Sequence, residues 1–282
     1  MNLSRRAFLA SLSAAVIPSA LGTGGDSRKI AMRIDMKGFG GAGEADIKAV
    51  LRSAAGEIWK HCPNTRFEQP GFAIYHNDKF PITHFERSDD GWIVIGLCLD
   101  GPYWARFAYQ FAHEFCHSLA DHTNDWRRLW HNPGHANHWL EESFCETASL
   151  FSLRAMAKTW ETQPPYVNWK DYSKALASYA KEWLDDPKHQ LPAGKTFIEW
   201  FRESEPEMRK NSTIRDKNGV VAAQLLPLFE AEPRGWETVT TLNLCKRIEA
   251  RPLADHFAEW MANTRPELQP FVKKITVVFG MG

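Results

Sequence analysis

The sequence lacks several features that mark common classes of protein. Lys and Arg together number 34, the same as Asp and Glu, so the chain has no net formal charge at pH 7. A nucleic-acid-binding protein usually shows a basic surplus, and this balance argues against one. After the first two dozen residues no run of 18 or more apolar residues occurs, so we expect no membrane span in the mature chain. Internal repeats and low-complexity tracts are also missing.

Cysteine is scarce, and its spacing excludes one kind of metal site. The chain has five cysteines and no C-x-x-C pair, so we expect no cysteine-based zinc site. An odd number leaves at least one cysteine without a disulfide partner.

The first 22 residues are typical of an export signal. Arg5 and Arg6 precede a short apolar run that extends from Ala7 to about Leu21. This arrangement resembles the twin-arginine signal, and an ordinary secretory signal or an uncleaved anchor is the alternative. We therefore expect residues 1–22 to be a signal peptide and the protein to be exported, either periplasmic or secreted.

Strand-like segments come first in the remaining sequence, and helix-like segments follow. Apolar runs predict strands at 29–35, 72–75, 82–85 and 92–97, with a hairpin turn at 88–91. Helical spacing of apolar residues predicts helices at 45–61, 103–121, 139–158, 169–185, 195–204, 217–230 and 253–263. A last apolar run, 275–279, is expected to form a closing strand. Strands followed by helices predict an α+β fold, with a catalytic domain at 23–160 and a mainly helical subdomain at 161–282.

A metal-binding motif lies inside the helix predicted at 103–121. His113 and His117 are four residues apart, so a helix presents both imidazoles on one face to a single metal ion. Glu114 follows the first histidine, where its carboxylate can take a proton from a zinc-bound water. The H-E-x-x-H pattern therefore predicts one zinc ion per chain, with Glu114 as general base. A surface helix that carries the pattern by chance is the alternative.

The third metal ligand is expected on the next helix. The metzincin pattern would need glycine at Ala120 and histidine at Thr123, so this sequence does not fit it. The segment 139–146, Trp-Leu-Glu-Glu-Ser-Phe-Cys-Glu, resembles the W-L-x-E-G-F segment of the gluzincins, the aminopeptidase-like and thermolysin-like zinc peptidases. This resemblance implies a zincin-like fold, with Glu142 as the third ligand. It also implies that Glu146, one helical turn further on, holds a ligand histidine by its other ring nitrogen.

The sequence departs from the gluzincin pattern at several points. Ser143 stands where the segment has glycine, and Glu141 is a rival for the ligand position. Residues 214–219 resemble the Y-x-K-G helix start of aminopeptidase-like enzymes but contain no tyrosine, so the group that polarises the substrate carbonyl cannot be carried over. Its candidates are Arg215, His131, His135 and His138.

Two cysteines lie beside the predicted ligands. Cys116 precedes His117, and Cys145 follows Glu142 by three residues. Facing helices could bring the two thiols within reach of a disulfide. The alternative is a pair of small buried residues, because free cysteine packs well in a core.

Together these features predict an exported zinc metallopeptidase that acts on peptide or protein substrates. An extended substrate is expected to pair with an edge strand supplied by the hairpin that ends in the strand at 92–97. A zinc-binding envelope or substrate-binding protein with a degenerate site is the first alternative, which the missing tyrosine favours. A helical binding module is the second.

Overall fold

A small β-sheet forms one side of the molecule. The fold is that of a computed structural model, which describes residues 30–64, 71–84, 86–120, 136–245 and 250–282. Across these residues the sheet has the order β1-β2-β4-β3. Its strands are β1 (Met32–Ile34), β2 (Phe72–His76), β3 (Ile82–Thr83) and β4 (Ile93–Leu97). The first three in spatial order, β1, β2 and β4, run parallel, and β3 pairs antiparallel with β4.

The predicted hairpin is confirmed, and it supplies a strand at one edge of the sheet. Gly91, at φ +82°, donates its N–H to the Ser88 carbonyl at 2.7 Å and closes the turn. Of the hairpin's two strands, β4 is interior, because it pairs with β2 on one side and β3 on the other. Ile93 and Ile95 are buried, and such an apolar strand belongs in the interior of a sheet. The edge strand is therefore β3.

The helices occupy most of the remaining chain. They are α1 (Glu44–Trp59), α2 (Trp104–Ala120), α4 (His138–Trp160), α5 (Ser173–Asp185), α6 (Phe197–Lys210), α7 (Arg215–Ala231), α8 (Trp236–Val239), α9 (Leu253–Asn263) and α10 (Gln269–Val278). Short 3-10 turns include η1 (Val167–Tyr172), η2 (Pro187–His189) and η4 (Leu242–Leu244). The predicted α+β class is confirmed. The strand predicted at 275–279 is wrong, because this run lies in α10 and at its end; short apolar runs fit a buried helix as well as a strand.

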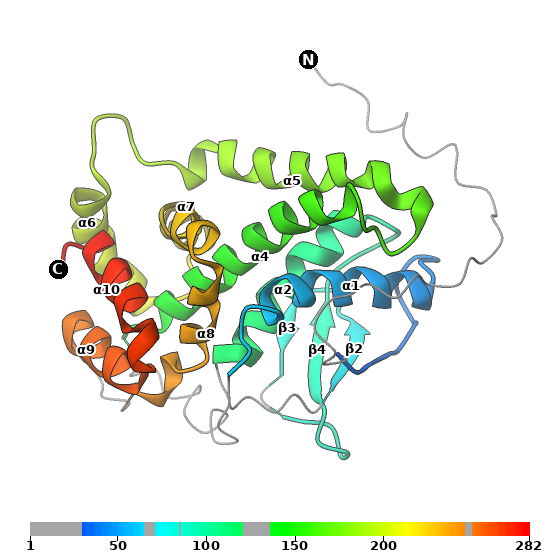
Figure 1. Cartoon of the computed structure of the whole chain (residues 1–282), viewed down its shortest axis with the longest axis horizontal. Coiled ribbons are helices and arrows are strands. Elements are labelled where there is room, and N and C mark those ends of the chain that lie inside the picture. The colour runs from blue at the N-terminus through cyan, green and yellow to red at the C-terminus, as the bar shows by residue number, and fades with distance from the viewer. Residues whose placement is uncertain (1–29, 65–70, 85, 121–135, 246–249) are drawn as a thin grey trace.

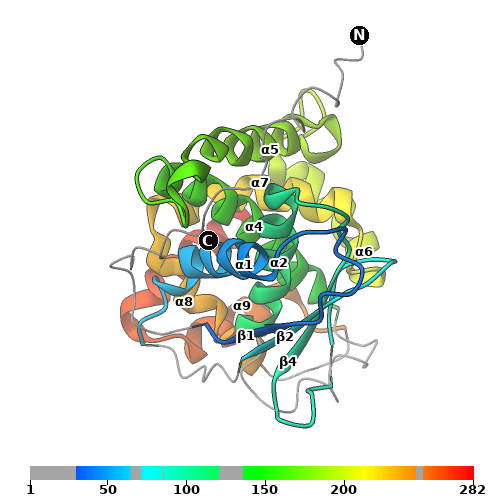
Figure 2. The ribbon, with the colours of Figure 1, turned by 90° about the vertical axis from the view of Figure 1, so that its right-hand side faces the viewer.

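The elements are stacked in layers (Figures 1 and 2). Helices α1 and α2 pack against each other beside the sheet, and α2 contacts both β3 and β4. Helix α4 lies against α1 and α2 and also contacts α5 and α7. In both views α5 is on the side of the molecule opposite the sheet. Helices α2 and α4 are thus enclosed between the sheet and the later helices.

Both central helices are buried on nearly every face. In α2 every residue except Arg106 and Gln110 is buried, and a helix that is apolar all round belongs in a core. Gln110 fixes its position by exchanging two hydrogen bonds with the backbone of Cys98, at 2.9 and 3.0 Å. Ser149 on α4 donates to the Tyr109 carbonyl at 2.8 Å, which ties α4 to α2. The first two bonds hold α2 to the segment after β4, and the third holds α4 to α2.

The C-terminal helices share one apolar core with the rest of the chain. Phe144 on α4 contacts Phe229 of α7 and Trp260 of α9, with ring centroids 5.8 and 5.5 Å apart. The boundary predicted between residues 160 and 161 stays a prediction.

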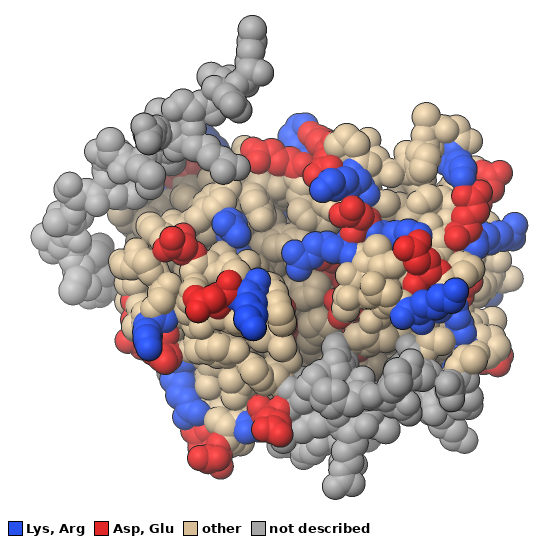
Figure 3. All heavy atoms as spheres, turned by 180° about the vertical axis from the view of Figure 1, so that it is seen from behind, with Lys and Arg blue, Asp and Glu red and all other residues tan. Residues whose placement is uncertain are grey.

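Acidic and basic side chains lie side by side on the face seen in Figure 3. No helix within the described ranges combines the length and the apolar character that crossing a membrane requires.

Candidate metal centre

The two histidines of the motif lie together in the core. His113 and His117, one turn apart on α2, are each 7% exposed, and their ring centroids are 5.0 Å apart. The Nε2 atoms of both rings face the carboxylate of Glu142 on α4. Glu142 Oε2 lies 3.5 Å from His113 Nε2, and Glu142 Oε1 lies 3.8 Å from His117 Nε2. The structure thus brings together the three residues predicted as metal ligands.

The spacing of these donor atoms suits a zinc ion. Zinc binds nitrogen and oxygen donors at about 2.0–2.2 Å in a tetrahedron, so two donors on one ion lie about 3.3 Å apart. The measured separations of 3.5 and 3.8 Å are slightly larger. Glu142 is therefore close to each histidine at nearly the spacing that two ligands of one ion require.

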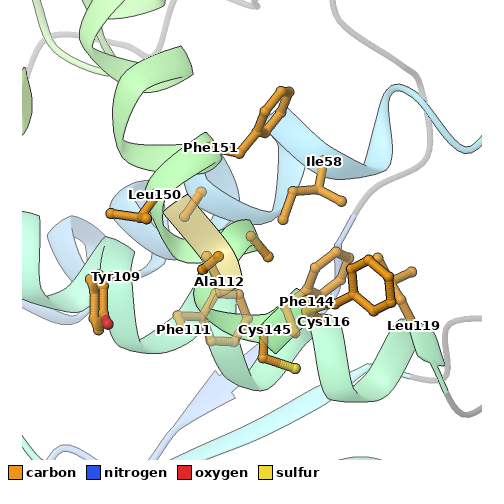
Figure 4. Packing of buried hydrophobic residues seen from close by; sticks show 14 of the residues in the cluster. Ile58, Tyr109, Phe111, Ala112, Cys116, Leu119, Phe144, Cys145, Leu150 and Phe151 are labelled. Carbon is orange, nitrogen blue, oxygen red and sulfur yellow. The ribbon is translucent and has the colours of Figure 1, made fainter. Parts of the chain in front are cut away.

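A second donor set shares the two histidines. Among the described residues, His113, His117 and Cys145 are buried and each offers one atom within 4.8 Å of the others, so this group can hold a metal ion. Cys145 lies among apolar side chains between α2 and α4, next to Cys116 (Figure 4). Both thiols are free, with no disulfide between them. Burial and the neighbouring Cys116 thiol raise the pKa of Cys145 well above its usual range, which disfavours the thiolate. Glu142 is the other candidate for the third ligand, because its carboxylate faces both Nε2 atoms.

The charge of Glu142 is coupled to that of the two histidines. Burial by itself raises the pKa of Glu142, but His117 and His113 outweigh it and lower the pKa to about 2. Burial lowers the pKa of His117, but Glu142 and Glu141 outweigh it and raise the pKa to about 10. In the metal-free protein, His117 therefore carries the positive charge that compensates this buried acidic cluster.

Glu141 holds a ligand rather than competing for the metal. Its Oε1 atom accepts a hydrogen bond from His117 Nδ1 at 2.7 Å, so His117 Nε2 is left to point toward Glu142. Its Oε2 atom accepts a hydrogen bond from Asn243 Nδ2 at 2.8 Å. Glu141 therefore fixes the orientation of His117, whereas the resemblance implied such a contact with a histidine only for Glu146.

Glu146 lies on the other side of the site, next to His113. Its Oε1 atom is 3.9 Å from His113 Nδ1, too far for a hydrogen bond, and that nitrogen is buried without a hydrogen-bond partner among the described residues. Glu146 accepts a hydrogen bond from the Tyr109 hydroxyl and pairs with Arg215 Nε at 3.4 Å. The orienting role that the resemblance implies for Glu146 stays a prediction, since it requires a further approach to His113.

The predicted general base is held by the edge strand. Glu114 is 3% exposed, and its Oε2 atom accepts a hydrogen bond from the Thr83 hydroxyl at 2.7 Å. Thr83 belongs to β3, so the same strand that borders the site fixes this carboxylate. This hydrogen bond gives the Glu114 carboxylate a fixed orientation.

Two of the residues considered for polarising a carbonyl lie near the ligands. Arg215, the first residue of α7, is half-exposed beside Glu146. Burial works against its charge, but Glu146 and Tyr109 outweigh it and raise the pKa of Arg215. His138 lies on the far side, where its Nδ1 atom is 2.8 Å from the Ser212 hydroxyl and its Nε2 atom is 3.8 Å from Glu141. His131 and His135 fall outside the described residues, as does the export signal at 1–22.

Three residues that contact the glutamates of this site were not predicted from the sequence. Tyr109 lies four residues before His113, so helical spacing could have found it. Thr83 and Asn243 come from distant parts of the chain, and no local pattern marks either of them.

A comparison of this chain with protein-family models, with curated proteins and with solved structures finds no match.

Proposed function

We propose that this protein is a zinc-dependent hydrolase, and specifically a metallopeptidase with a zincin-like fold. The observation that carries the proposal is the meeting of His113 Nε2, His117 Nε2 and the Glu142 carboxylate, with the Glu114 carboxylate on the same helix as the histidines. Two imidazoles and one carboxylate form a ligand set that suits zinc and leaves a fourth position for water or substrate. The resemblance of segment 139–146 to the gluzincins supports the same set.

The side chains around this set divide the chemical work between them. Zinc in such a site is a Lewis acid, which lowers the pKa of water and polarises a carbonyl. Glu114 accepts the proton of the attacking water while Thr83 fixes its carboxylate by the 2.7 Å hydrogen bond. Arg215 lies on the Glu146 side, where its charge can stabilise negative charge that develops on the substrate oxygen.

A peptide is the substrate class that the sheet favours. Strand β3 pairs with β4 on one side, and no strand within the described part of the chain pairs with its other side. An extended peptide can bind such an edge through its backbone groups. Thr83 in β3 contacts Glu114, so a peptide bound along this strand would pass close to the general base.

One observation favours a second function, that of a zinc-binding protein without peptidase activity. Cys145 lies within 4.8 Å of both histidines, measured between possible ligand atoms. If its sulfur joined Glu142 and the histidines, four protein ligands would surround the ion. A closed set of this kind is typical of structural zinc sites, which leave no position for water.

The deciding experiment compares the wild-type protein with Glu114→Gln. We expect the wild type to hold about one zinc per chain and to cleave fluorescently labelled casein. Glu114→Gln should keep the zinc and lose cleavage, because the amide cannot accept the proton. Glu161→Gln, at an exposed glutamate just after α4, is the matched control and should behave as wild type. A wild-type protein that holds zinc but cleaves no casein or peptide mixture would favour the second function.

A further inference from the structure

Asn243 reaches the metal centre from the C-terminal part of the chain. It lies in the turn η4 (Leu242–Leu244), 102 positions after Glu141. Its Nδ2 atom donates to Glu141 Oε2 at 2.8 Å, while Glu141 Oε1 accepts from His117 Nδ1 at 2.7 Å. The two oxygens of one buried carboxylate are thus used by two different partners, and neither the carboxylate nor the imidazole can turn without breaking a bond.

The turn that carries Asn243 is itself firmly anchored. Leu242, directly before it, is 1% exposed, and Cys245, two positions after it, is 6% exposed, so two buried side chains anchor the turn. The Thr241 hydroxyl lies 2.9 Å from the Thr264 hydroxyl at the end of α9. The packing of η4 on α9 therefore helps to set the position of the Asn243 amide.

We propose that Asn243 is a positioning residue for the metal ligand His117, through which the C-terminal helices help the protein to retain its metal ion. The inference rests on the proposed function, because it takes His117 as a ligand. Asn243 does not touch the metal position; it holds Glu141, and Glu141 holds the imidazole.

The geometry shows what losing the amide does. Glu141 is 4% exposed, and without Asn243 its Oε2 atom has no hydrogen-bond donor at that position. His138 Nε2, 3.8 Å away, is a competing partner that draws the carboxylate to another side. A carboxylate that turns toward His138 loses its bond to His117 Nδ1, and the imidazole then points at the metal position for less of the time. Metal affinity falls as a result.

The test is a zinc titration in competition with a chromogenic chelator on purified full-length protein. Removing a residue that is hydrogen-bonded directly to a ligand lowers metal affinity by about 10–100-fold. Asn243 contacts the ligand only through Glu141, so we expect Asn243→Ala to lower zinc affinity by about 3- to 10-fold. Asn243→Asp should lose more, because it replaces the donor by a negative charge next to Glu141. Leu244→Ala, at the exposed neighbouring position, is the matched control and should bind zinc as the wild type does.

Which of Asn243→Ala and Asn243→Asp loses more zinc affinity distinguishes a positioning role of Asn243 from a purely structural one. Aspartate has nearly the shape of asparagine, so a structural role predicts that Asn243→Asp is the milder change. Equal melting temperatures of the metal-free variants would show that all are folded, and Asn243→Ser replaces any variant that is not. Zinc affinities of both Asn243 variants within twofold of Leu244→Ala would overturn the inference and leave the proposed function intact. Wild-type protein that binds no zinc would overturn both.

Discussion

Replacing Glu142 by alanine should remove most of the bound zinc. A four-ligand zinc site contributes about 10–16 kcal/mol of binding free energy, which is about 2.5–4 kcal/mol for each ligand. Loss of one ligand therefore lowers zinc affinity by about 10²- to 10³-fold. In Glu142→Ala the Nε2 atoms of His113 and His117 keep their places on α2 but lose the carboxylate that faces both of them.

The assay compares Glu142→Ala with Cys145→Ser, which alters the rival donor 4.8 Å or less from the histidines. Zinc affinity should fall in Glu142→Ala and stay within about threefold of the wild type in Cys145→Ser, because serine keeps a small polar side chain at a position that does not bind the metal. Cobalt-substituted wild-type protein should lack the near-ultraviolet band of a thiolate bound to cobalt. A strong thiolate band, together with zinc lost in Cys145→Ser and kept in Glu142→Ala, would refute the assignment of Glu142.

The remaining predictions concern the base, the cysteines and the protons of the site. Thr83→Val should lower kcat on labelled casein about 10-fold at unchanged zinc content, because a hydrogen bond to a charged group contributes about 1.5–3 kcal/mol. Thr83→Ser should restore the wild-type kcat. Equal kcat in all three proteins would contradict the role of Thr83. In the native metal-free protein only Cys98 should react quickly with an alkylating reagent, since the other four cysteines are buried. All five should react after unfolding without reductant. If mass spectrometry finds two cysteines that remain unalkylated after unfolding, they form a disulfide. The pKa of His117 is raised to about 10, so at pH 7 the metal-free protein holds a proton that zinc must displace. Zinc affinity should therefore rise about 10-fold per pH unit as pH increases toward 10, measured by titration in non-chelating buffers, and a flat profile from pH 7 to 9 would contradict it.

The placement of the two histidines on one face of α2 was predictable, because it depends only on their spacing along the sequence. A spacing of four residues in a helix is enough to put His113 and His117 on one face. The rotation of α4 was harder to predict, because this helix is buried on nearly all sides and its apolar pattern marks no single face. The sequence alone therefore left Glu141 as a rival ligand. The 2.7 Å bond to His117 Nδ1 instead leads us to expect that Glu141→Ala weakens zinc binding.

Long-range contacts explain what the sequence could not show. Thr83 reaches Glu114 only because β3 pairs outside β4, and strand order depends on packing across the whole sheet. Asn243 reaches Glu141 only because η4 packs on α9. The run at 275–279 was assigned to a strand because five apolar or β-branched residues fit either structure until their neighbours in space are known.

X-ray absorption at the zinc edge of the zinc-loaded protein is the most direct test of the proposed centre. Two imidazoles, the Glu142 carboxylate and a water predict a first shell of nitrogen and oxygen atoms at about 2.0–2.2 Å, with the outer-shell scattering of two histidine rings. The same spectrum should be obtained from Glu114→Gln, because Glu114 lies outside the first shell. A sulfur atom at about 2.3 Å would show that Cys145 binds the ion, and the centre would then not be the open hydrolytic site proposed for this protein.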